Sequence, residues 1–436
     1  MSELFLGVFA LLPLIIDASA IRPFETPKIQ LFEIAVVFFA AAVLISRFHS
    51  RLRSGKCPSG TVPGGHLPGV DVSTLDLCVL GSFAILALAS AFSISPGLSF
   101  FGSEERVLGL VFYLAVTAMY FCIRIDANSE GLRKYFFASL AVSVIVAVYG
   151  IAQWFGFDVA GLQNSFPVYG TYGAERAFGT IGHPNLFAAY LAMILPFALL
   201  LPRFWMRTLF VFILSFAILA SYSRAAWIAA GLGMMASVSC LYPVLARKWL
   251  PRFAGIAAVL ITVIFLNGPS LLNSSNSFLF RLGTLTDFQN GSARARLEEW
   301  KFGATKLLER PILGYGPETY ALISYTRVKN PHEAARGAPG PDPSIADRLH
   351  NLELDTLWNS GILGLVALLM TLWFAFRELR VWLKSGKNRV EAAAVMGSLV
   401  AYLVANQAGF DFSVTAILFS LLLARIAFAE EEKPEF

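Results

Sequence analysis

Long apolar stretches recur along the whole chain and leave few other folds open to it. A helix that crosses the hydrocarbon core of a membrane needs about 20 apolar residues. About twelve stretches approach or reach that length, which is typical of transmembrane helices. They lie near residues 4–21, 29–47, 75–94, 107–123, 135–155, 185–201, 207–221, 225–245, 252–267, 352–376, 390–407 and 413–429. The sequence therefore predicts an all-α polytopic membrane protein.

Composition supports a membrane protein throughout, rather than a soluble domain with one anchor. Charged residues make up 14% of the chain and hydrophobic residues 56%, whereas soluble domains carry about 25% charged residues. The net charge of +5 is spread over many short loops, so no basic face for nucleic acid is expected. No Cys-x-x-Cys pair occurs among the four cysteines, which supports neither a disulfide framework nor a metal site.

The basic residues predict how the helices are oriented. Alternate short loops hold roughly 17 arginines and lysines, and the opposite short loops hold about 5, so the first set is expected in the cytoplasm. Both termini are then cytoplasmic. The start Met-Ser-Glu lacks the basic residues of a signal peptide, so the first span is expected to be retained. Residues 1–267 are predicted to form nine transmembrane helices, 268–351 one large loop on the outer face, and 352–436 three further helices and a cytoplasmic tail.

The large loop is predicted to contain an amphipathic helix over residues 293–310. An apolar stripe is expected on one of its sides, and proline and glycine follow it. The residues of that stripe are Leu297, Trp300, Ala304, Leu307 and Leu308. Such a helix suits the membrane surface or the end of the helical bundle.

Three polar residues stand out in this apolar background, and the topology places them on one face. Arg224 joins two apolar runs, Arg296 lies in the large loop, and His350 closes that loop. Charged residues at membrane depth are costly and usually functional. A guanidinium binds phosphate oxygens through two parallel donors, and histidine is the commonest general base. The alternatives are an arginine at the membrane interface, an exposed arginine and a hydrogen-bonded interfacial histidine.

Further residues on the same face are candidates for binding an anionic substrate. Arg296 lies four residues before Trp300, so the two are expected on one side of a helix. The predicted substrate-binding residues are Arg106, Arg176, Arg294, Arg348, Trp300 and Asn351. His183, followed by Pro184 and Asn185, is a rival to His350, but the proline suits a first helical turn, so a capping role for His183 or Asn185 is favoured.

Some absences also narrow the chemistry. The chain has no Asp-x-Asp pair to hold a metal against a nucleotide sugar, no P-loop, and no Gly-x-Gly-x-x-Gly after a strand. No metal and no cofactor is therefore expected. A nucleotide-driven enzyme is disfavoured, and a lipid-linked donor with its own good leaving group would remove the need for one.

Several stretches resemble the O-antigen ligase and polymerase superfamily of bacterial envelopes. They begin at Arg176 and Ser221, each ahead of an apolar run, and at Arg296 and His350, where the large loop starts and ends. The two glycine-containing stretches Pro311-Ile-Leu-Gly-Tyr-Gly316 and Ser360-Gly-Ile-Leu-Gly364 also match. The resemblance covers about residues 100–375. Family members often carry an acidic residue where this chain has Asn359-Ser360, and Glu353 or Asp355 is a candidate substitute.

The resemblance implies glycosyl transfer at the periplasmic face of the bacterial inner membrane. The donor would be a glycan on undecaprenyl diphosphate, and in the ligase subfamily the acceptor is the lipid A core. Arg224 and Arg296 would hold the diphosphate as it leaves, and His350 would take the proton from the acceptor hydroxyl. Direct displacement would invert the anomeric carbon, with neither metal nor nucleotide.

Other functions stay open on the sequence alone. The Arg-x10-Gly repeats common in outer loops of polymerases are absent, which favours a ligase, while a polymerase or transfer onto a protein are alternatives in the same superfamily. A transporter of lipid-linked or anionic substrates is an alternative of another class. It would more often show polar residues near the midplane and a repeated half.

Overall fold

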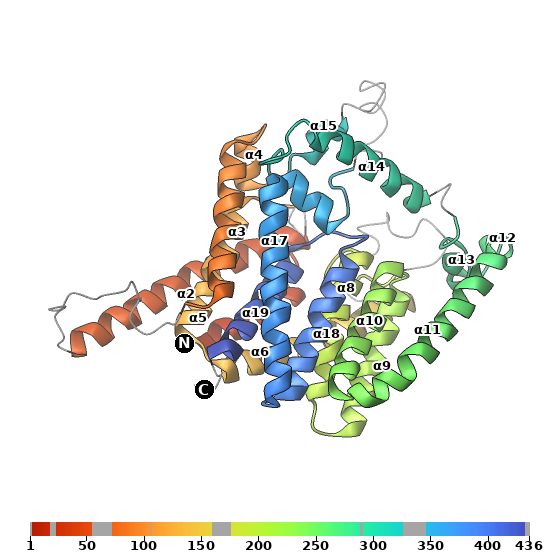
Figure 1. Cartoon of the computed structure of the whole chain (residues 1–436), viewed down its shortest axis with the longest axis horizontal. Helices are drawn as coiled ribbons and strands as arrows, with labels where there is room; N and C mark the ends of the chain where they lie inside the picture. Colours follow the sequence, from red (N-terminus) through yellow and green to blue (C-terminus); the bar gives the residue numbers. More distant parts are fainter. Residues whose placement is uncertain are drawn as a thin grey trace.

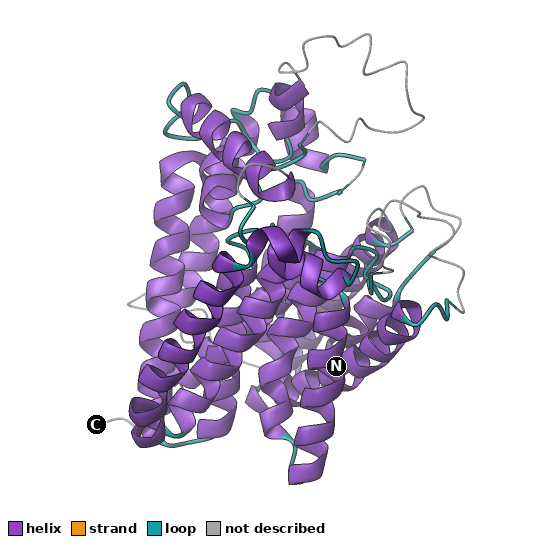
Figure 2. Ribbon diagram, turned by 90° about the vertical axis from the view of Figure 1, so that its right-hand side faces the viewer, coloured by secondary structure: helices purple, strands orange, loops and turns teal. Residues whose placement is uncertain are grey.

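The structure is a computed structural model that describes residues 2–17, 23–54, 72–104, 106–158, 176–287, 291–325 and 346–431. Every regular element in these ranges is a helix (Figure 2). The expectation of an all-α protein is therefore confirmed for the described residues.

The helices follow one another with short connections. In the first half they are α1 (Ser2–Leu11) with the 3-10 turn η1 (Leu12–Leu14), α2 (Glu25–Ser54), α3 (Thr74–Ala91), α4 (Pro96–Phe101), α5 (Leu110–Asp126), α6 (Ser129–Trp154), α8 (Pro184–Ile194) with η3 (Leu195–Leu200), and α9 (Phe204–Ala220). In the second half they are α10 (Arg224–Leu241), α11 (Pro243–Leu266), α12 (Gly268–Leu272), α13 (Ser277–Gly283), α14 (Gly291–Leu307), α15 (Tyr320–Ser324), α17 (Leu352–Ser385), α18 (Arg389–Ala405) and α19 (Ser413–Glu431).

Each of the twelve expected apolar stretches overlaps a helix, but the stretch near 4–21 is helical only to Leu14, and its residues 18–21 lie outside the described residues. Seven helices are long and apolar enough to cross a membrane, namely α2, α3, α6, α10, α11, α17 and α19. The segments 2–14, 184–200 and 204–220 are apolar but shorter. The protein is thus a multi-pass membrane protein by its helices, while the number of spans and their orientation stay predictions.

One predicted boundary is wrong. We expected a basic connection between residues 245 and 252, yet α11 runs unbroken from Pro243 to Leu266 with Pro251 inside it. The chain instead turns at Tyr242. Proline is well placed in the first turn of a helix, so Pro243 starts α11 several residues earlier than the apolar pattern suggests.

The centre of the bundle is formed by α8, α18 and α19. Nine of the eleven residues of α8 are buried, and 89% of the apolar window of α19 is buried, whereas none of α11 is. Small residues let α18 approach α10 closely, because a methyl group on Gly233 would lie 2.6 Å from the Gly397 carbonyl oxygen. Close contact at small residues is a common way for membrane helices to associate.

Helix α17 is interrupted near its start, and a loop segment docks at the break. Gly361 has φ 63° and ψ −161°, a conformation open essentially to glycine alone. The freed amide of Ile362 donates to the Pro311 carbonyl at 2.8 Å, and the amide of Tyr315 donates to the Trp358 carbonyl at 2.7 Å. The two glycine-containing stretches noted in the sequence are therefore hydrogen-bonded to each other.

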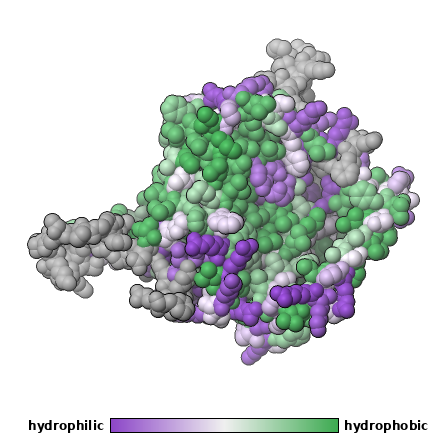
Figure 3. Space-filling view, viewed as in Figure 1, coloured by the Kyte–Doolittle hydropathy of each residue, from purple (hydrophilic) through white to green (hydrophobic). Residues whose placement is uncertain are grey.

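The segment that precedes α17 covers one end of the bundle. Figure 1 shows α14 and α15 at the upper end of the molecule, level with α4 and above α8 and α10, with α12 and α13 at the upper end of α11. Apolar side chains cover much of the flank seen in Figure 3, and polar side chains gather mainly toward the two ends. This end, called the loop end below, is where the candidate residues lie.

Candidate active site

The candidate residues lie at the loop end, and all but Arg296 are at or just before the first turn of a helix that starts there. Arg224 is the first residue of α10, His183 precedes α8, and His350 precedes α17. Arg106 lies just before α5, and Arg296 lies in α14, which covers this end (Figure 1). The expectation that they share one face agrees with this arrangement.

His350 is held in an unusual backbone conformation by a neighbouring carboxylate. Its φ is 57°, which is uncommon for a residue with a side chain. The Asp355 carboxylate accepts the amide hydrogens of Leu349 at 2.9 Å and Asn351 at 3.3 Å, one on each side of His350. Asn351 caps α17 by accepting from the Leu354 amide. The backbone around the imidazole is thus clamped to the first turn of α17.

The hydrogen bonds of His350 leave one ring nitrogen available as a base. Nδ1 lies 3.0 Å from the Arg348 carbonyl oxygen, and a carbonyl can only accept, so Nδ1 carries the hydrogen and Nε2 does not. Burial lowers the pKa of His350, and the charges of Arg296 and Arg106 lower it further, while Asp347 opposes them. A neutral imidazole with a free Nε2 lone pair is what a general base requires.

Phe410 is the centre of a group of rings and cations beside His350. The imidazole meets the Phe410 ring edge to face at 5.2 Å. The guanidinium groups of Arg106 and Arg348 lie 4.6 and 5.3 Å from the same ring. Both distances fall within the range of cation–π attraction. Phe410 belongs to the loop between α18 and α19, so this loop packs against the imidazole of His350.

Arg106 and Arg348 also form ion pairs that hold this loop. Arg106 donates to Asp347 at 3.0 Å, and the buried Arg348 pairs with Glu318. Burial would raise the pKa of Asp347, but the charges of Arg106, His350 and Arg348 hold it below its usual range. Glu318 raises the pKa of Arg348 despite burial. These two arginines have carboxylate partners, which favours a positioning role over direct substrate contact.

Arg296 differs from the other arginines because it has no hydrogen-bond or ion-pair partner among the described residues. Its side chain is half-buried, and burial followed by the charge of Arg224 lowers its pKa. Arg224 donates to the carbonyl and hydroxyl oxygens of Thr284, at the end of α13. The two guanidinium groups therefore lie close enough to repel each other, an arrangement that an anion would relieve.

Arg176 braces the turn that leads to Arg224. Its Nε donates to the Ser221 carbonyl at 2.8 Å, and its terminal nitrogen donates to the Asn185 side chain at 3.0 Å. Within that turn Tyr222 has φ 54°. The arginine thus links a strained turn to the start of α8, and its predicted substrate contact stays a prediction.

The expectation that His183 caps a helix is confirmed. Its Nδ1 accepts from the Asn185 amide at 3.1 Å at the start of α8. Burial, together with the charges of Arg106 and Arg176, lowers its pKa to about 3. An imidazole so hard to protonate is a poor general base at neutral pH, which favours His350 over His183.

Helix α14 is present as predicted, but its predicted apolar stripe is partly wrong. Leu297, Ala304 and Leu308 are exposed, whereas Leu307 is buried and Trp300 half-buried. Trp300 donates its indole hydrogen to the Leu349 carbonyl at 2.8 Å. Because of that contact and the tertiary packing of this end, the buried side of α14 is offset by about one residue from the predicted stripe, which contains most of its leucines.

The two arginines of α14 lie on different sides of the helix, because residues two apart do not face the same way. Arg296 lies on the side of Trp300, as expected, while Arg294 is exposed and pairs with Glu298 at 2.8 Å. The structure does not bring Arg294 into the group around His350. Trp300, which touches the backbone next to His350, is placed as a support of that loop.

A family model described as O-antigen ligase matches residues 209–369. Over this range, which is a little more than a third of the chain, the protein is similar to the O-antigen ligase family. The matched range contains Arg224, Arg296 and His350, together with both glycine-containing stretches. No curated protein matches the chain.

The match supports a coarse activity. It is to a family of O-antigen ligases, which are glycosyltransferase-like enzymes, and so it indicates an enzyme of that general kind. The family match does not separate ligation from polymerisation.

Some residues of this candidate site were missed by the sequence analysis. Asp347 adjoins Arg348 in the sequence, so its charge was a usable signal. Asp355 appeared only as a substitute for a missing acid, and its bonds to two backbone amides had no sequence signal. Phe410 and Glu318 also had none, because their contacts depend on loops that meet only in the folded chain.

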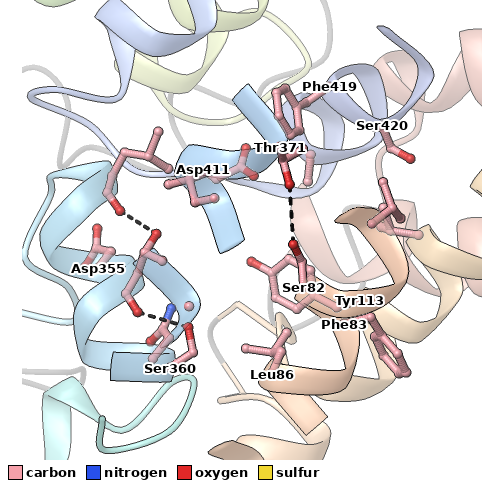
Figure 4. A pocket seen from close by; sticks show the side chains of 18 of the residues that line it. Ser82, Phe83, Leu86, Tyr113, Asp355, Ser360, Thr371, Asp411, Phe419 and Ser420 are labelled. Carbon is pink, nitrogen blue, oxygen red and sulfur yellow. Dashed lines mark hydrogen bonds between the residues drawn. The ribbon is translucent and has the colours of Figure 1, made fainter. Parts of the chain in front are cut away.

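A cavity of about 250 Å³ lies between α3, α5, α17 and α19, next to this group (Figure 4). Its lining includes Arg348 and Asp355 and continues along α3 past Ser82 and Leu86. Ser82 and Thr371 approach to 3.5 Å across it. Most of the lining is apolar side chain and carbon, so the cavity connects the polar loop end with the apolar flank of the bundle.

Proposed function

We propose that the protein transfers a glycan from undecaprenyl diphosphate onto the lipid A core at the periplasmic face of the bacterial inner membrane. The observation that carries the proposal is the grouping of Arg224, Arg296 and His350 at the loop end, inside the range matched by the O-antigen ligase family. Arg296, half-buried and without a partner among the described residues, is the clearest sign that an anion belongs there.

The chemistry follows from the orientation of these groups. His350 Nε2 takes the proton from an acceptor hydroxyl, and the oxygen attacks the anomeric carbon of the glycan. The bond from that carbon to the diphosphate oxygen breaks, and undecaprenyl diphosphate leaves. Arg224 and Arg296 stabilise the charge that develops on the diphosphate. Attack opposite to the leaving group inverts the anomeric carbon.

The cavity between α3 and α17 supports a lipid substrate, and we propose that it takes part of a lipid tail. Leu86→Trp, which points bulk into the cavity (Figure 4), should raise the KM for a lipid substrate and leave kcat nearly unchanged. Leu88→Trp is the matched control, because Leu88 is 45% exposed on the same helix and does not line the cavity. Equal kinetics for both variants would remove the cavity from the proposal.

The decisive experiment is a lipopolysaccharide gel from a deletion strain complemented with single variants. Arg224→Ala, Arg296→Ala and His350→Ala should each abolish the ladder of capped bands while the protein still inserts into the membrane. Arg224→Lys should fail as well, because an ammonium lacks the planar pair of donors. Arg294→Ala is the matched control and should keep the ladder. Wild-type ladders from the first three variants would defeat the assignment.

The deletion itself separates the alternatives. Loss of all capped bands with accumulation of lipid-linked polymer supports a ligase, and bands with a single repeat support a polymerase. An unchanged gel supports transfer onto a protein or another polymer. Consumption of the lipid-linked donor by purified protein in detergent distinguishes an enzyme from a transporter. Detergent solution has no compartments, so only an enzyme would consume the donor there.

A further inference from the structure

A second cavity, lined mainly by charged and polar residues, lies at the end of the bundle opposite the loop end. It has a volume of about 520 Å³ and is bounded by the start of α6, the turn between α17 and α18, and α19. Its lining includes Arg133, Lys134, Lys387, Asn388, Glu391 and Arg425. None of these residues belongs to the group around His350.

Arg425 is the feature of this cavity that calls for a ligand. Its side chain is 0% exposed, and its Nε donates to Glu391 at 2.6 Å. Both terminal nitrogens are buried and have no hydrogen-bond partner. The guanidinium lies 4.1 Å from the Trp382 ring, so it is held flat with those donors unused. Burying charged donors without an acceptor costs free energy. The unused donors of Arg425 therefore suggest that a bound ligand supplies the acceptor.

The surroundings of Arg425 favour an anion. The lining carries four basic side chains and two acidic ones, since Glu130 also belongs to it. Lys134 is already paired with Glu3 and Glu130. Arg133 has only the Phe137 ring, at 5.9 Å, as a partner among the described residues. Two guanidinium groups therefore remain with unused donors at one cavity.

Helix ends add to the positive potential. The cavity touches Ser129 at the start of α6 and Asn388 at the start of α18. Asn388 makes no side-chain hydrogen bond to the helix that follows it. Unpaired amides at a helix start carry partial positive charge and bind anions well.

We propose that this cavity binds a phosphate group, with Arg425 and Arg133 as its main donors. Phosphate fits because its oxygens accept from several planar guanidinium donors at once. The group would come either from the head of an acidic phospholipid, since basic pockets between membrane helices bind such heads, or from free phosphate.

Binding by the purified full chain in detergent tests the proposal. Retention of phosphatidylglycerol is measured by native mass spectrometry, and inorganic phosphate is tested by its effect on thermal unfolding. Wild type should bind at least one probe. Arg425→Gln and Arg133→Gln should each weaken binding by about tenfold or more, the loss expected for charge-assisted hydrogen bonds. Retention of the lipid without any effect of inorganic phosphate identifies a lipid head, and an effect of both identifies phosphate alone as sufficient.

Arg380→Gln is the matched control, because Arg380 is an exposed arginine at the same end of α17 that does not line the cavity. It should bind like wild type. If Arg425→Gln does not fold, Arg133→Gln decides, since that side chain is exposed. Failure of both probes to bind wild type overturns the proposal, and so does equal binding by Arg133→Gln and wild type. The outcome is independent of glycan transfer at the loop end.

Discussion

The Asp355 carboxylate provides the sharpest test of how His350 is positioned. Asp355→Ala removes the acceptor for the amides of Leu349 and Asn351, and hydrogen bonds to a charged group contribute about 1.5–3 kcal/mol each. The left-handed backbone of His350 costs roughly 1–2 kcal/mol. Without the clamp, that strain lowers the population of the observed conformation by about 5–30-fold. We expect kcat for glycan transfer to fall by a similar factor.

The assay is transfer by purified protein in nanodiscs, with a lipid-linked glycan donor and core lipopolysaccharide as acceptor. A double-mutant cycle separates positioning from general damage. In a His350→Ala background, where this assay measures the small residual rate that leaves no ladder on a gel, Asp355→Ala should lower thermal stability as before but cause no further loss of transfer. Glu353→Ala is the control on the same helical turn, because Glu353 accepts from Gln407 alone among the residues that the structure describes, and it should keep near-normal transfer. Additive losses in the double variant, or normal transfer by Asp355→Ala, would refute the reasoning.

Two further predictions follow from backbone strain and from titration. Gly361→Ala should lower thermal stability by about 3 kcal/mol or more, because φ 63° with ψ −161° costs roughly 1–3 kcal/mol and the methyl group would overlap the Ile312 carbonyl. Gly386→Ala, at φ 74° in open space, should cost only the strain of about 1–2 kcal/mol, and equal melting curves would contradict the role of the docked loop. A general base must be neutral, so transfer should fall as pH drops through the lowered pKa of His350, and the acid midpoint of kcat against pH should lie below 6.5. Asp347 raises that pKa, so Asp347→Asn should move the midpoint to lower pH, and a shift in the opposite direction would count against His350 as the base.

The helices were predictable because apolar length is itself the physical requirement for a span. Each expected stretch therefore overlaps a helix in the described residues. Boundaries were less certain where two features compete. Pro243 and Pro251 both suit a helix start, and the sequence pattern did not indicate that the chain would turn at Tyr242.

The candidate site was predictable only as far as topology allows. Alternating direction is enough to place Arg224 and His350 at the same end of the bundle. The phase of α14 was not predictable, because contacts of Trp300 with the backbone near His350 decide which side faces inward. Arg296 thus lies inward, and Arg294, two residues before it and so on the other side of the helix, lies outward. The bonds between Asp355 and its backbone partners likewise form only in the folded loop.

The unpaired state of Arg296 has a consequence for turnover. Among the described residues no carboxylate forms an ion pair with its guanidinium, so none is placed to displace a bound diphosphate after the reaction. On the proposed function, the spent carrier keeps its diphosphate and is held by the same cation that held the donor. Accumulated undecaprenyl diphosphate is then expected to act as a product inhibitor. The turnover rate in the cell would depend on how quickly the carrier is removed and recycled.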